Sequence, residues 1–189
     1  MKGLFTHPDW LAQVRPSFSS DQKSWLMRPG PLTAGLRQIG QVRLDVISER
    51  PEGLSTDETH PLSRPPRSAV WVREVLMSID DVPCVFARSL TPLRASHGTW
   101  QGIRRLRNRP LADILYDEAS IRRSAFEVAR IQRHMPLHQT YRNLRLEQGT
   151  KPSSLLARRS VFWRDKEPLL VSECFLPAFW RMLFAYYKK

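Results

Sequence analysis

A single carboxylate on an apolar strand pattern is the first residue in this sequence that calls for a chemical explanation. Residues 168–177 alternate so that Glu173 falls on the same face as Val171 and Phe175. A carboxylate in apolar surroundings is costly unless it is paired or hydrogen-bonded. An ion pair, or a charge on an edge strand that points to water, explains Glu173 as well as a ligand site does.

The segment 70–77 repeats this pattern with the opposite charge. Arg73 shares a face with Trp71 and Val75. A guanidinium group in apolar surroundings is suited to holding a carboxylate through two parallel hydrogen bonds. The alternative is that Arg73 pairs with Glu173 or with another acid, and the spacing alone leaves both interpretations open.

Other chemistry finds little support in the residues. The sequence has no Gly-x-Gly-x-x-Gly, no phosphate-binding loop and no Gly-x-Ser-x-Gly. His134 and His138 are four residues apart, but Pro136 between them argues against a helical metal pair. Cys84 and Cys174 lack the spacing of zinc ligands and are predicted to be buried, reduced thiols. We therefore expect neither a metal nor a cofactor.

The net charge of +12 favours an anionic partner. Residues 104–164 contain fourteen Lys or Arg and only five Asp or Glu, so most of the surplus lies there. Nucleic acid and small dianionic metabolites both fit such a surplus. Because no nucleic-acid-binding motif is present and the aromatic residues do not interleave with the basic run, we expect no nucleic acid. The arginines of residues 104–109 and the pair Arg158-Arg159 are interpreted as solvated basic surface.

Length and hydropathy indicate an ordinary globular protein. The 189 residues fit one domain, residues 1–189, with a core at about 25–177. The N-terminus does not have the pattern of a signal peptide, and no stretch is apolar enough to span a membrane, so we expect a cytoplasmic location. The tail, 178–189, is aromatic and basic. It could touch a membrane or a partner, but packing against the domain is the favoured interpretation.

Periodicity and turn residues predict an α+β fold. Strands are expected at 42–47, 69–78, 84–91, 122–131, 155–163 and 168–175, and helices at 20–27, 32–39 and 111–116. Tight turns at 80–81 and 164–167 join two pairs of strands as hairpins, which indicates one antiparallel sheet. Strands and helices are segregated along the chain, as α+β folds require. Residues 50–68 are rich in proline and are expected to form a long loop, either a lid or a connector.

Four segments of the sequence form a recognisable set of motifs: residues 71–76 (WVREVL), 108–112 (NRPLA), 156–160 (LARRS) and 169–177 (LLVSECFLP). Together they resemble the motifs of the chorismate pyruvate-lyase family. They occur in the family's order and at close to its spacing, and the resemblance extends from about residue 25 to residue 177. The most specific parts are the strand that carries Arg73 and the last strand, which carries Glu173.

The resemblance implies a fold, an activity and ligands. It implies a six-stranded antiparallel sheet whose helices cover a buried ligand pocket. The implied enzyme is a monomeric lyase that needs no cofactor and removes pyruvate from chorismate. Its product, 4-hydroxybenzoate, is the first committed intermediate towards ubiquinone.

The resemblance also implies roles for particular residues. Arg73 would hold the ring carboxylate, and Glu173 would meet the oxygen para to it, which makes these the expected catalytic residues. The backbone of Leu32 and of Leu111 would contact the ligand as well. The family commonly has Met where this chain has Leu32, and Gly where it has Ala112. A further cation should meet the pyruvyl carboxylate; on motif position alone, the candidates are Arg88 and Arg159.

A non-catalytic module that binds small aromatic acids is the alternative function. The ligand-binding domains of GntR-type repressors are similar to this family in fold, and a fold does not fix a function. Such repressors carry a separate DNA-binding domain, for which we expect no room before Trp25. The lyase is therefore the preferred hypothesis.

Overall fold

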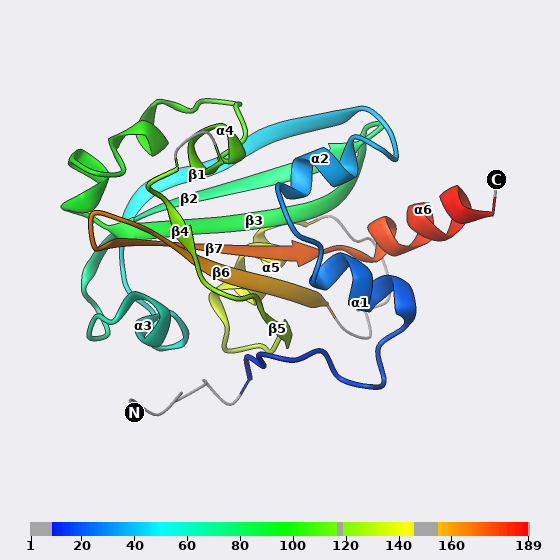
Figure 1. Ribbon diagram of the computed structural model, residues 1–189, viewed down its shortest axis with the longest axis horizontal. Helices are drawn as coiled ribbons and strands as arrows, with labels where there is room; N and C mark the ends of the chain where they lie inside the picture. The colour runs from blue at the N-terminus through cyan, green and yellow to red at the C-terminus, as the bar shows by residue number, and fades with distance from the viewer. Residues whose placement is uncertain (1–8, 117–118, 146–154, 189) are drawn as a thin grey trace.

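A computed structural model describes residues 9–116, 119–145 and 155–188 of the chain. Its centre is one antiparallel sheet of seven strands (Figure 1). The strands are β1 (Val42–Gly53), β2 (Ala69–Ile79), β3 (Val82–Pro92), β4 (Arg122–Arg123), β5 (Glu127–Arg130), β6 (Leu156–Arg164) and β7 (Glu167–Phe175). They are arranged in the order β1-β2-β3-β7-β6-β4, and β5 pairs with β6 beside β4. The predicted α+β class and antiparallel sheet are confirmed.

Two tight hairpins form the middle of the sheet. Asp80 and Asp81, between β2 and β3, have φ angles of 45° and 63°, and Asp165 and Lys166, between β6 and β7, have 48° and 65°. Two successive left-handed residues are the conformation that matches the twist of a two-residue hairpin. β3 and β7 then pair with each other, which joins the hairpins into one surface.

Three sequence predictions about this sheet need correction. The first strand continues past Pro51 to Gly53, because β1 is an edge strand on which a missing N–H is tolerated. The expected loop at 50–68 contains a helix, α3 (Thr56–Leu62). The expected strand at 122–131 is interrupted between β4 and β5, where the Ser124 hydroxyl accepts a hydrogen bond from the backbone N–H of Val161. That interruption raises the number of strands from six to seven.

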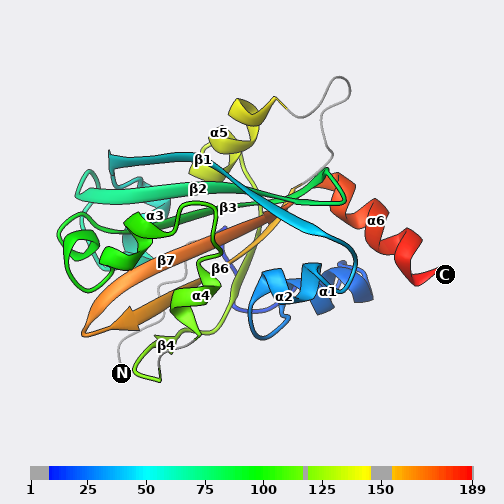
Figure 2. The ribbon, with the colours of Figure 1, turned by 90° about the horizontal axis from the view of Figure 1, so that it is seen from above.

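Helices cover both faces of the sheet (Figure 2). We call the face that carries Arg73 and Glu173 the pocket face, and the face that carries Glu74 and Arg88 the opposite face. The pocket face is covered by α1 (Ser20–Leu26), α2 (Leu32–Leu36), two 3-10 turns, η1 (Ala95–His97) and η2 (Gln101–Arg105), and α4 (Ala112–Leu115). The opposite face is covered by α3 and α5 (Pro136–Leu144). The Ser19 hydroxyl caps α1 by accepting from the N–H of Gln22.

The C-terminal tail forms a helix, α6 (Pro177–Tyr187), that packs on the end of the sheet. Phe179 and Leu183 are buried in the core, and the Met182 sulfur lies 3.4 Å from the Cys84 sulfur. The favoured interpretation of the tail, packing against the domain, is confirmed for this part of the helix. Farther along, Phe184 and Tyr187 are exposed. None of the helices in the described ranges has the length and apolar character needed to cross a bilayer.

Both cysteines are buried, reduced thiols, as predicted. Burial raises the pKa of the Cys84 thiol to about 11, and burial also raises the pKa of Cys174 well above its ordinary value. The thiolate is the form that attacks thiol reagents, so both groups should be inert in the folded protein.

We expect Cys84 to report on the docking of α6. At pH 8 the native protein should react with Ellman's reagent far more slowly than the urea-unfolded protein. In a Cys174→Ser background, Phe179→Ala should accelerate the reaction of Cys84, because it removes a buried ring that holds α6 in place. Phe184→Ala, a change at an exposed ring of the same helix, is the matched control and should leave the rate unchanged. Equal rates in both variants would contradict this account of the helix.

Candidate active site

A cavity lies on the pocket face between the sheet and the segments that cover it. Apolar side chains form most of its walls, among them Leu44, Val75, Met77, Leu115, Phe162 and Val171. The two expected catalytic residues, Arg73 and Glu173, line it, and so do the two expected backbone contacts, Leu32 and Leu111. A largely apolar cavity with a few polar groups is the usual form of a small-molecule site.

Arg73 is held rigidly at one side of this cavity. Its side chain is 2% exposed; Nε donates to Oε1 of Glu49 at 2.9 Å, and Nη2 donates to the carbonyl oxygens of Arg107 and Arg109 at 2.6 and 3.3 Å. Burial lowers the pKa of Arg73, and the charge of Glu49 opposes that effect. Among the described residues, none accepts a hydrogen bond from Nη1. That nitrogen is therefore the one left for a ligand.

Glu173 is paired with Arg158 and not with Arg73. Arg158 Nε donates to Oε2 of Glu173 at 2.6 Å, and Nη1 donates to the carbonyl oxygens of Trp25 and Arg28 at 3.1 and 2.9 Å. Arg158 is 1% exposed, so its interpretation as solvated surface was wrong. Arg158 lies in the middle of a buried strand, two residues before Ser160 and therefore on the same face as Ser160. That position was the signal that could have placed Arg158 in the site.

The register of the sheet sets the separation of the two predicted catalytic residues. Arg73 lies opposite Ser89, and Ser89 lies opposite Val171, whereas Glu173 lies opposite Ala87. Glu173 is thus two strands away from Arg73 and two residues further along. From the spacings of an antiparallel sheet, their Cα atoms should be roughly 12 Å apart. With side chains reaching inwards from both positions, the site suits a ligand that has a polar group at each end.

Leu32 and Leu111 stand at the beginnings of two short helices that cover the cavity. Leu32 is the first residue of α2, and Leu111 is the N-cap of α4. Backbone N–H groups at a helix start have no partner within the helix, so they are available to a ligand. Ala112 adopts a helical conformation and is not among the described residues with positive φ. Alanine in place of the family's glycine therefore imposes no backbone strain here.

Comparison with known proteins identifies the family. The model of the family described as "Chorismate lyase" matches residues 4–183. The chain belongs to the chorismate lyase family. A relative from Bordetella avium (strain 197N), named probable chorismate pyruvate-lyase, is 53% identical over 172 residues, which are 91% of this chain and 85% of that protein. A relative from Pseudomonas entomophila (strain L48), named probable chorismate pyruvate-lyase 1, is 40% identical and covers 92% of each chain.

Solved structures of low sequence identity share this fold. The C-terminal domain of PhnF matches with a TM-score of 0.54 at 18% identity, covering 74% of this chain and 86% of that domain. The effector domain of PhnF from Mycobacterium smegmatis matches with a TM-score of 0.52 at 10% identity, covering 79% and 90%. At such identities the likeness extends to the fold alone.

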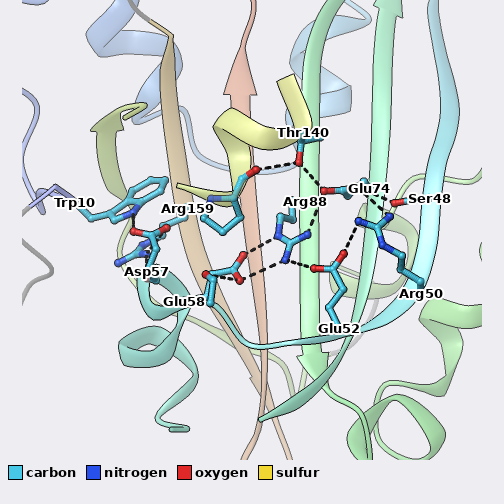
Figure 3. A network of polar contacts seen from close by, with 12 residues as sticks. Trp10, Ser48, Arg50, Glu52, Asp57, Glu58, Glu74, Arg88, Thr140 and Arg159 are labelled. Atoms are coloured by element: carbon cyan, nitrogen blue, oxygen red, sulfur yellow. Dashed lines mark hydrogen bonds and ion pairs between the residues drawn. The ribbon is translucent and has the colours of Figure 1, made fainter. Parts of the chain in front are cut away.

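Arg88 and Arg159, the predicted partners of a pyruvyl carboxylate, do not line the cavity of this chorismate lyase family member. Both side chains lie on the opposite face of the sheet (Figure 3). Arg159 Nε donates to Oε2 of Glu127 at 2.7 Å, and its guanidinium lies over the ring of Trp10. The prediction was wrong because motif position does not take account of the pleat, which turns every second side chain away from the pocket.

Arg88 is the centre of a buried ionic network on that face. It donates to Glu58 at 2.7 Å, to Glu52 at 2.8 Å and to Glu74 at 3.1 Å. Burial disfavours its charge, but Glu58 and Glu52 outweigh that effect and raise the pKa of Arg88. The network joins β1, β2, β3 and α3, so it holds the strand that carries Arg73 in register.

Glu74 connects this network to α5. Its carboxylate accepts hydrogen bonds from Thr140 at 2.6 Å and from Ser48 at 2.8 Å. Burial alone would raise the pKa of Glu74, but these hydrogen bonds and the charge of Arg88 together lower it below the ordinary value. Its ionised form therefore stabilises the folded state.

Replacing Arg88 should destabilise the protein without altering ligand contacts directly. Arg88→Met would leave Glu58 buried without its cation and would leave Glu74 with only the longer ion pair to Arg50 at 3.6 Å, which should cost about 3–5 kcal/mol. Urea unfolding at pH 7 measures the loss. Arg43→Met, at an exposed ion pair of β1, is the control and should cost less than about 1 kcal/mol. Comparable losses in the two variants would contradict the role given to the network.

The contribution of Glu74 should depend on pH. A carboxyl group whose pKa is lower in the folded state stabilises the protein above its unfolded pKa, which is close to 4.5. That contribution is lost as the pH falls through the lower folded value. The difference in unfolding free energy between wild type and Glu74→Gln should therefore be largest near pH 7 and shrink below pH 4.5. A difference that grows on acidification would contradict this assignment.

Proposed function

We propose that this protein removes pyruvate from chorismate and releases 4-hydroxybenzoate. Membership of the chorismate lyase family supports this reaction. The observation that carries the proposal is the placing of Arg73 and Glu173 on one apolar cavity wall, two strands apart. Chorismate has matching groups, a carboxylate on the ring and a hydroxyl on the carbon para to it.

This reaction depends more on the positioning of the substrate than on a strong catalytic group. The bond between ring carbon C3 and the ether oxygen breaks, and the hydrogen on C4 leaves as a proton. The released enolpyruvyl group gains a proton and becomes pyruvate, while the ring becomes aromatic. Aromatisation makes the reaction strongly favourable, so holding the substrate in one reactive conformation can supply much of the rate enhancement.

Each site residue has a role in this scheme. Arg73 binds the ring carboxylate through Nη1, since its other nitrogens are engaged with Glu49 and backbone carbonyls. Glu173 accepts a hydrogen bond from the C4 hydroxyl and fixes that end of the ring. The backbone N–H groups of Leu32 and Leu111 contact the ligand from the two covering helices.

The proposal has consequences for turnover and for the working unit. The product keeps the carboxylate and has a phenol at C4, so it retains both polar contacts. Its release is then expected to limit turnover. The proposal retains the monomeric state that the family resemblance implied. The proposal retains the cytoplasmic location expected from the sequence, with ubiquinone synthesis as the destination of the product.

An assay with purified protein and chorismate, without added metal or cofactor, tests this function. Wild type should form 4-hydroxybenzoate and pyruvate in equal amounts. Arg73→Ala and Glu173→Ala should each lower kcat/KM by about 10- to 100-fold, the effect of losing one charge-assisted hydrogen bond. Arg43→Ala, at an exposed residue of β1 outside the cavity, is the control and should retain full activity.

The alternative function predicts a different result. A non-catalytic module would bind 4-hydroxybenzoate, and Arg73→Ala would weaken that binding. The wild type would then make neither product from chorismate. Such a result would overturn the lyase while leaving the cavity as a binding site for aromatic acids.

A further inference from the structure

We propose that Arg158 and Arg123, which both stack on the ring of Phe126, form the subsite for the carboxylate of the enolpyruvyl group. This inference rests on the proposed function and assigns the cation that sequence motifs placed at Arg88 or Arg159. Arg158, Arg123 and Phe126 all line the cavity.

The net positive charge of the residues that line the cavity favours a ligand with two carboxylates. The described residues that line it include three arginines, Arg73, Arg123 and Arg158, and one acid, Glu173. The surplus is two positive charges in a mostly apolar space. Chorismate carries two carboxylates, whereas 4-hydroxybenzoate carries one. Arg73 accounts for the ring carboxylate and leaves the other surplus charge without an anion.

The order of charges across the sheet places this second subsite. Arg158 lies directly opposite Glu173 in the pairing of β6 with β7, on the side away from Arg73. From Arg73 towards Arg158, the site therefore presents a cation (Arg73), an anion (Glu173) and a second cation (Arg158). The substrate presents the ring carboxylate, the C4 hydroxyl and, on the neighbouring carbon C3, the enolpyruvyl ether. A ring held between Arg73 and Glu173 therefore carries its second carboxylate at the Arg158 end.

Arg158 has the same form of anchoring as Arg73. Each uses Nε for a carboxylate and one Nη for two backbone carbonyls. For Arg158 the remaining nitrogen is Nη2, which has no acceptor in the part of the chain that the structure describes. A buried guanidinium that is fixed on two sides and open on the third is a pre-organised carboxylate site.

Arg123 completes the subsite from the exposed side. Its guanidinium carbon lies 4.3 Å from the centre of the Phe126 ring, and that of Arg158 lies 4.4 Å from it. Nη1 of Arg123 also donates to the hydroxyl of Tyr116, another lining residue, at 3.1 Å. Two cations close to one ring repel each other, and a bound carboxylate that contacts both relieves that repulsion. The interruption between β4 and β5 makes this arrangement possible, because Phe126 lies within it.

Binding of two aromatic acids to Arg123→Gln tests the outer half of the subsite. The probes are 4-hydroxybenzoate and 3-(carboxymethoxy)-4-hydroxybenzoate, a stable dianion with its second carboxylate on an ether at C3. Measured by calorimetry, the Kd of the dianion should rise about 5- to 10-fold, the effect of one partly exposed charge-assisted contact. The Kd of the monoanion should change less than about twofold. The KM for chorismate should rise with the Kd of the dianion.

Arg122→Gln is the matched control for this experiment. It removes the same charge from the neighbouring position of β4, and Arg122 does not line the cavity. It should leave both Kd values and the KM unchanged. Equal losses for the two probes in Arg123→Gln, or no loss for either, would overturn the subsite.

The role of Arg158 must be tested in a Glu173→Gln variant, in which residue 173 is neutral. Removing Arg158 from the wild type would leave the Glu173 carboxylate unpaired. Glu173→Gln should still bind the dianion more tightly than the monoanion. Adding Arg158→Gln should abolish that preference, a loss of about tenfold or more in the ratio of the two Kd values. An unchanged ratio would exclude Arg158 from the subsite.

The two proposals fail in distinguishable ways. Neither probe can react, so their Kd values report on the subsite whether or not the protein turns over chorismate. A wild type that converts chorismate while Arg123→Gln keeps its ratio of Kd values would overturn only the subsite. A wild type that binds the dianion through Arg123 and makes no product would overturn the lyase reaction.

Discussion

The pleat of the β-sheet is the constraint on which both faces of this protein depend. Two strands carry charged residues in consecutive positions, Arg73 and Glu74 on β2 and Arg158 and Arg159 on β6. Successive side chains of a strand point to opposite faces. Each pair is therefore divided, with one member lining the cavity and the other joining the ionic contacts on the opposite face. A shift in register by one residue would exchange the two sets.

The cavity arginines also bind the segments that cover the cavity. Arg73 donates to the backbone carbonyls of Arg107 and Arg109, shortly before α4, and Arg158 donates to those of Trp25 and Arg28, at the end of α1 and just after it. Carbonyls near helix ends and in turns lack regular partners, so a buried guanidinium satisfies them while they hold it in place. The same hydrogen bonds thus close the cavity and orient the groups that are proposed to bind substrate.

The likeness to the two PhnF domains extends to the fold alone, because the identities are low. Family membership rests on the family model and on the close sequence relatives. A cavity over an antiparallel sheet can serve recognition or catalysis. In this chain the function is proposed to depend on side chains that line the cavity, above all Glu173 and the three arginines.

Local pattern in the sequence determined most of the strands, whereas the roles expected of Arg73 and Glu173 came from the family resemblance. Alternation identified the strands and placed Arg73 and Glu173 on apolar faces, and turn residues located both hairpins, because these signals depend on neighbours within a few positions. The sequence could not give the partner of Glu173, the burial of Arg158 and Arg159 or the network around Arg88. Those features depend on the pairing of β3 with β7 and of β6 with β7, and on α3 and α5, two short helices held by contacts with distant strands. Whether a charge is solvated, paired or left facing a ligand is decided by such long-range contacts, so only the tertiary structure showed which arginines enter the cavity.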